Sequence, residues 1–124
     1  MDEDRFSCLM SDIDPELVEF LRTRVNSFVK WDLIHFFHDH PHVTETAENV
    51  ARYVRWDTDA IRVELSDLVD QKVLVRRQED EWTAYSLTEK AAVSDLVHRF
   101  VEASSDPQFR VKAVYQVIRS MRLS

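Results

Sequence analysis

Residues 44–88 read TETAENVARYVRWDTDAIRVELSDLVDQKVLVRRQEDEWTAYSLT, and this stretch decides the fold. Its first half holds two segments whose apolar residues recur at the spacing of one helix face, namely Ala47, Val50, Ala51 and Val54, then Ile61, Leu65, Leu68 and Val69. Thr44 or Thr46 suits the N-cap of the first segment, and Asp57 suits that of the second. Because only a dipeptide lies between the segments, the sequence predicts two helices joined by a very short turn.

The second half of the stretch predicts two strands. Residues 73–77 and 82–87 are rich in β-branched and aromatic side chains, and the polar residues 78–81 join them. Two such segments with a short polar connection are typical of a β-hairpin. A hairpin that follows two short-linked helices is the wing of a winged helix-turn-helix.

Two more helices are predicted before this stretch. Asp14-Pro15-Glu16 is a helix start signal, because Asp is a favoured N-cap and Pro suits the first helical position. The next helix, capped by Asn26 or Ser27, is apolar over much of its circumference and ends before Pro41. Such a helix is expected at the centre of the fold, with neighbours on more than one side.

Two helices are also predicted after the hairpin. Thr88 suits the N-cap of the first, and Asp106-Pro107 opens the last. The last helix carries an apolar stripe at coiled-coil spacing, formed by Val111, Val114, Ile118 and Met121. We expect this stripe to form a homodimer interface. The alternative is that the same stripe packs on the first helix of its own chain.

The fold class expected from these elements is mainly α with one β-hairpin. It is a winged helix-turn-helix with extra N- and C-terminal helices. Residues 1–12 are acidic and are expected to be flexible. Residues 13–124 are expected to form one domain, with a core motif at 27–88 and C-terminal helices at 89–122.

Several core positions between Thr46 and Thr88 resemble those of the MarR/ArsR-type winged-helix regulators. They are Ala47-x-x-Val50-Ala51, Ile61-x-x-x-Leu65-x-x-Leu68-Val69, Val73-Leu74-Val75 and Tyr85-x-Leu87-Thr88. The resemblance implies a DNA-binding transcriptional regulator whose second motif helix enters the major groove. The chain departs from these families at Lys72, where a Gly usually precedes the first wing strand.

The charge balance opposes simple DNA binding. The chain has 23 acidic and 16 basic residues and a net charge of −7. The helix expected to read DNA carries Arg62 against five acids, namely Asp57, Asp59, Glu64, Asp67 and Asp70. Because DNA affinity comes largely from Lys and Arg on phosphates, an acidic module that binds a protein and no DNA remains the alternative function.

The residues that could still serve DNA binding are few. Arg62 and Ser66 project away from the apolar face of their helix, and Thr58 lies in its first turn. Arg76 and Arg77 lie in the wing, and Arg52 and Arg55 flank the approach. The predicted DNA contacts are therefore Arg52, Arg55, Thr58, Arg62, Ser66, Arg76 and Arg77.

The sequence gives little support to metal binding, cofactor binding or enzyme chemistry. His35, His38, His40 and His42 gather near the end of one helix and could bind a metal or sense pH, but a polar helix end is the favoured interpretation. The chain contains no glycine, which excludes Gly-rich phosphate loops, and it shows no catalytic motif. We expect a non-enzyme without metal or cofactor. The single cysteine and the lack of a long apolar run predict a cytoplasmic protein with no membrane partner.

Overall fold

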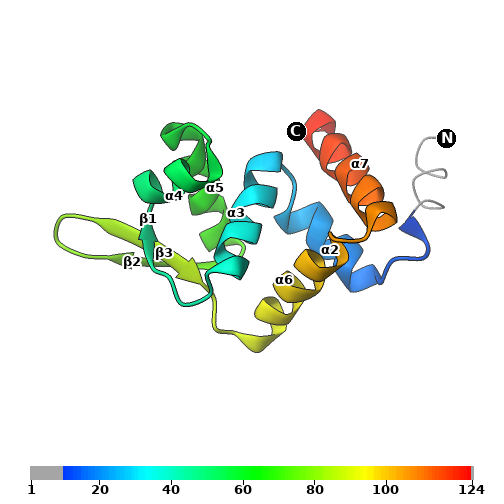
Figure 1. Cartoon of the computed structure of the whole chain (residues 1–124), viewed down its shortest axis with the longest axis horizontal. Helices are drawn as coiled ribbons and strands as arrows, with labels where there is room; N and C mark the ends of the chain where they lie inside the picture. The colour runs from blue at the N-terminus through cyan, green and yellow to red at the C-terminus, as the bar shows by residue number, and fades with distance from the viewer. Residues whose placement is uncertain (1–9, 124) are drawn as a thin grey trace.

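The computed structural model describes residues 10–123, which form six helices and one three-stranded antiparallel sheet (Figure 1). The elements are α2 (Pro15–Arg24), α3 (Phe28–Asp39), β1 (Glu45–Thr46), α4 (Ala47–Val54), α5 (Thr58–Asp70), β2 (Leu74–Gln78), β3 (Thr83–Leu87), α6 (Ala91–Ala103) and α7 (Pro107–Leu123). The predicted order of helices and hairpin is confirmed. None of these helices is long and apolar enough to cross a bilayer.

The helix starts follow the predicted capping residues. Asp14 Oδ1 accepts a hydrogen bond from the Glu16 N–H at 2.9 Å, and Ser27 Oγ accepts one from the Lys30 N–H at 3.1 Å. Thr46 caps α4, and Asp57 caps α5. Each side-chain oxygen satisfies a backbone N–H that lacks a partner inside the helix.

The start of α6 differs from the prediction. This helix begins at Ala91, after Lys90, and not directly after Thr88. Thr88 is buried, and its N–H donates to the Val73 carbonyl over 3.0 Å. Its hydroxyl accepts from the Lys90 N–H at 3.2 Å. Thr88 therefore closes the wing and turns the chain toward α6.

The sheet contains one strand more than predicted. Its order is β1-β3-β2, with Glu45 opposite Tyr85 and Arg76 also opposite Tyr85 on the other side of β3. The prediction of a lone hairpin was therefore incomplete. A strand of two residues has no periodicity to recognise, and it exists because β3 offers it a free edge.

The core lies around α3, as the sequence predicted. Leu33, Ile34 and Phe37 of α3 are fully buried, as are Ile61 and Leu65 of α5. α3 packs against α4, α5 and α6, so it has neighbours on several sides. The two short-linked helices and the hairpin thus share one apolar interior with α3 (Figure 1).

The flanking helices α2, α6 and α7 form a second group beside the winged-helix body (Figure 1). α7 buries Phe109, Ala113 and Val117, at helical spacing, and packs against α2. The stripe predicted from the sequence lies elsewhere on this helix. The alternative that the stripe packs on the first helix of its own chain was therefore wrong.

The N-terminal segment is ordered where the structure describes it. Met10 is 5% exposed and belongs to the core. Lys112 Nζ of α7 donates to Asp12 Oδ1 over 2.6 Å. Met10 is therefore packed and Asp12 is paired with α7, although residues 1–12 were expected to be flexible. The remainder of that prediction, at residues 1–9, lies outside the described residues.

Two turns place residues with a Cβ in the left-handed region. Arg55 has φ of 62° and Lys72 has φ of 68°. Glycine adopts this region without steric cost, whereas another L-residue there costs about 1–2 kcal/mol. Lys72, which stands where the resembled families have Gly, therefore keeps the backbone conformation that a Gly would adopt.

Candidate DNA interface

The turn between α4 and α5 fixes the direction of α5. The Arg55 N–H donates to the Ala51 carbonyl at 2.8 Å and ends α4. The next residue, Trp56, donates from Nε1 to Asp32 Oδ2 at 2.7 Å and so fastens the turn to α3. The indole bridges the gap beside the turn and holds the start of α5 in one position.

The outward face of α5 is the centre of the candidate interface. Arg62 and Val63 are exposed, Ser66 is half-buried, and the apolar residues of the opposite face are fully buried. The predicted inward and outward faces are therefore confirmed. Val63 is 68% exposed. An exposed valine beside an arginine offers an apolar contact to a thymine methyl next to a polar contact to guanine.

Arg62 has two carboxylate partners in the protein. It forms an ion pair with Glu48 of α4, and its Nη1 lies 3.4 Å from Asp59 Oδ1. The Glu48 pKa is held below its usual value by a backbone hydrogen bond and by the Arg62 guanidinium. Arg62 therefore lies at the surface, but its guanidinium must release at least one of these carboxylates before it can bind a base.

Two acids of α5 serve an internal ion pair that sequence analysis missed. Lys30 of α3 is buried, and its Nζ lies 3.2 Å from Glu64 Oε2 and bonds to Asp67. Asn26 Oδ1 accepts a third bond from the same ammonium at 2.6 Å. Lys30 thus offsets one of the two negative charges of Glu64 and Asp67, which reduces the repulsion that α5 would exert on phosphate.

Arg76 of the wing contacts α5. Arg76 Nη2 donates to Ser66 Oγ at 3.0 Å, and its guanidinium lies 5.8 Å from the centre of the Tyr85 ring. Arg77 follows in the strand and points to the opposite face of the hairpin, because side chains alternate along a strand. It is exposed and has no ion pair with any described residue. Arg76 and Ser66 are brought together, whereas Arg77 lies apart.

The other three predicted contacts lie where α4 ends and α5 begins. Arg52 and Arg55 are exposed on the last turn and at the end of α4. Thr58 is half-buried at the first position of α5. Within residues 10–123, no side-chain ion pair holds either arginine.

An acidic cleft lies between the wing tip and the helices. Its volume is about 460 Å³, and its lining includes Glu48, Arg62 and the turn residues 78–83. Three consecutive acids of that turn stand beside Trp82, which is 46% exposed. This part of the wing therefore repels phosphate, and its half-exposed indole lies beside carboxylates.

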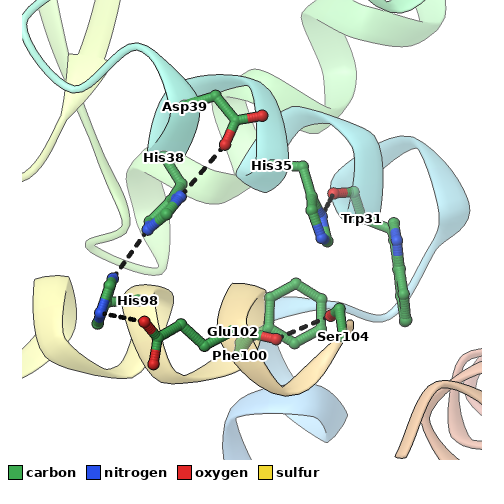
Figure 2. Close-up of polar contacts among 8 residues, drawn as sticks. All are labelled: Trp31, His35, His38, Asp39, His98, Phe100, Glu102 and Ser104. Carbon is green, nitrogen blue, oxygen red and sulfur yellow. Dashed lines mark hydrogen bonds and ion pairs between the residues drawn. The ribbon is translucent and has the colours of Figure 1, made fainter. Parts of the chain in front are cut away.

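The histidines near the end of α3 do not converge. His35 Nδ1 donates to the Trp31 carbonyl at 2.9 Å, and His40 packs on Phe36 with ring centres 5.0 Å apart. His38 instead meets His98 of α6 (Figure 2). In the described part of the chain, no three side chains with metal-binding groups are placed to share an ion.

The comparisons with known proteins agree with this fold. No protein-family model and no curated protein sequence matches the chain. A possible transcriptional regulator from Methanosarcina mazei Go1 is similar at a TM-score of 0.50 and 13% identity, over 85% of this chain and 80% of that one. The YusO protein from Bacillus subtilis is similar at a TM-score of 0.54 and 12% identity, over 98% and 93% of the two chains. The chain therefore has a winged-helix fold, mostly helical with one small three-stranded antiparallel sheet.

Proposed function

We propose that this protein is a winged-helix transcriptional regulator that binds double-stranded DNA through α5 and the wing. The observation that carries the proposal is the continuous surface formed by Arg62, Val63 and Ser66 of α5 with Arg76 of β2. It combines donors for base edges, an apolar group and a wing cation on one face. The similar protein from Methanosarcina mazei Go1, described as a possible transcriptional regulator, supports the same assignment.

The roles on this surface follow from side-chain chemistry. Arg62 reads a guanine edge with two donors, Val63 contacts a thymine methyl, and Ser66 positions the helix, with Thr58 in support. Arg76 and Arg77 hold the wing on the phosphate backbone, and Arg52 and Arg55 contact phosphates beside α4. A protein of this kind acts by binding, not as an enzyme, and works in the cytoplasm without a cofactor.

The proposed assembly is a homodimer through the outer face of α7. Val111 is 69% exposed and Ile118 is 43% exposed, while Val114 is half-buried, and Met121 extends the same stripe. A second copy would cover this stripe and present two sets of arginines to DNA, which raises affinity by avidity. Light scattering of wild type and Ile118→Glu tests this assembly. A dimer mass that falls to monomer in the variant is expected, and a monomeric wild type at high concentration contradicts it.

A gel shift with genomic fragments at low salt tests the DNA proposal. Wild type is expected to shift a subset of fragments, and Arg62→Ala is expected to lose that selection. Arg22→Ala is the matched control, because Arg22 is an exposed arginine on α2 whose partner is Glu19. Absence of any shift by wild type at low salt would overturn the proposal.

The acidic cleft at the wing tip favours one competing function. Its carboxylates and the half-exposed Trp82 suit a basic segment of a protein partner. On this alternative the fold is an acidic interaction module that does not bind DNA. The same gel shift separates the two functions, since only the regulator shifts DNA.

A further inference from the structure

His38 of α3 and His98 of α6 face each other across the contact between these helices (Figure 2). His38 Nε2 lies 3.0 Å from His98 Nδ1. The two outer ring nitrogens each meet a carboxylate: His38 Nδ1 lies 3.4 Å from Asp39 Oδ1, and His98 Nε2 lies 3.1 Å from Glu102 Oε1. Four side chains thus form one row, carboxylate–imidazole–imidazole–carboxylate.

The row has a definite proton requirement. Each carboxylate only accepts, and the contact between the rings needs one nitrogen that donates and one that accepts. Three N–H groups therefore satisfy all three contacts, which leaves one ring neutral and the other positively charged. A fourth proton places N–H groups on both facing nitrogens, so that two cations repel each other. Removal of a proton leaves one of the three contacts without an N–H group.

We propose that His38 and His98 form a proton-operated latch between α3 and α6. With one shared positive charge the latch ties the last turn of α3 to the middle of α6. With two charges the latch opens at this end of the helix contact. Further along the same contact Trp31 and Phe100 still pack, with ring centres 5.0 Å apart. In the chain, α6 follows the wing and leads into α7, so the latch lies between these two elements.

The charged side chains on the neighbouring elements pair with residues outside the row. On α6, Arg99 pairs with Asp95 at 3.9 Å and with Asp14 at the start of α2. From α5, the carboxylates that contact α3 bind Lys30, near the opposite end of that helix. From α4, the Tyr53 ring packs on the rings of Phe36 and His40, with ring centres 5.3 Å and 6.1 Å away.

The test is a pH titration of the full chain, followed by the NMR signals of both imidazoles. In wild type each ring is expected to respond in two steps, because the two sites share their protons. In His98→Gln the His38 signal is expected to lose one step, and in His38→Gln the His98 signal does the same. His42→Gln is the matched control, because His42 is exposed and outside the row.

Thermal unfolding gives a second readout. In acid, the unfolded chain carries a positive charge on both His38 and His98, whereas the closed latch carries one charge shared between them. Acidification therefore lowers the Tm of wild type. This loss is expected to be smaller in His98→Gln. Independent single-step titrations of both rings in wild type would overturn the latch. So would a change of the curves on adding EDTA, since that result identifies a bound metal in place of the shared proton.

Discussion

Arg62 of α5 forms an ion pair with Glu48 of α4, and this contact controls the central cation of the candidate interface. Glu48→Gln is expected to raise the affinity for DNA by about 1.4- to fivefold, because an exposed ion pair is worth about 0.2–1 kcal/mol and its loss frees the guanidinium. Fluorescence anisotropy with a labelled duplex measures the change. Glu16→Gln, on the exposed start of α2, controls for net charge. An equal gain in both variants would attribute the effect to net charge alone.

The buried Lys30 holds α5 against α3. Lys30→Met is expected to lower the free energy of unfolding by about 2–3 kcal/mol, because it leaves Glu64 and Asp67 side by side without a cation. The expected cost is below that of a fully buried pair, since the Asp67 side chain is 43% exposed. Urea unfolding measures it. Lys90→Met, at an exposed position, should change stability by no more than about 0.5 kcal/mol. Equal effects of the two variants would refute the anchoring role.

The left-handed turn at Lys72 stores strain. Lys72→Gly is expected to raise the free energy of unfolding by about 0.5–1 kcal/mol, because the steric cost removed exceeds the entropy that glycine adds to the unfolded chain. Lys72→Ala removes the same side chain but keeps the Cβ, so its stability should stay near that of wild type. A gain in the alanine variant as large as that in the glycine variant would show that the side chain, and not the backbone, is the cause.

The contact between Asp12 and Lys112 predicts that the stability of the fold depends on pH. The Lys112 ammonium, followed by a backbone hydrogen bond, lowers the pKa of Asp12 from its ordinary 3.8. A lowered folded-state pKa gives stability that is present above pH 3.8 and is lost as the pH falls through the folded value. The stability difference between wild type and Asp12→Asn should therefore vanish in that acid range. Asp80→Asn is the matched control, because Asp80 is an exposed acid on the wing tip. A difference that persists below the folded pKa would argue against the ion pair.

The sequence was sufficient for the elements that local chemistry controls. The caps at Asp14, Ser27 and Asp57 and the apolar faces of α4 and α5 follow from short-range spacing. β1 could not be predicted, because it depends on pairing with β3. The buried face of α7 was also missed, since this helix carries two apolar stripes and only the packing against α2 decides which is covered.

The candidate site was harder to predict because its contacts join residues distant in the chain. Asp67 pairs with a lysine 37 residues away, and His38 meets a histidine 60 residues away. No spacing rule connects such pairs. The sequence therefore listed Arg62, Ser66 and Arg76 as separate candidates. The bond from Arg76 to Ser66, and the carboxylates that hold Arg62, became visible only in the fold.

The salt dependence of DNA affinity tests the central claim most directly. For a duplex selected by wild type, the logarithm of the association constant is expected to fall linearly with the logarithm of salt concentration. In Arg77→Ala the slope should become shallower by about one, since one phosphate contact is lost. A wild-type chain that binds no duplex at low salt, or whose affinity does not depend on salt, would contradict a DNA-binding role for α5 and the wing.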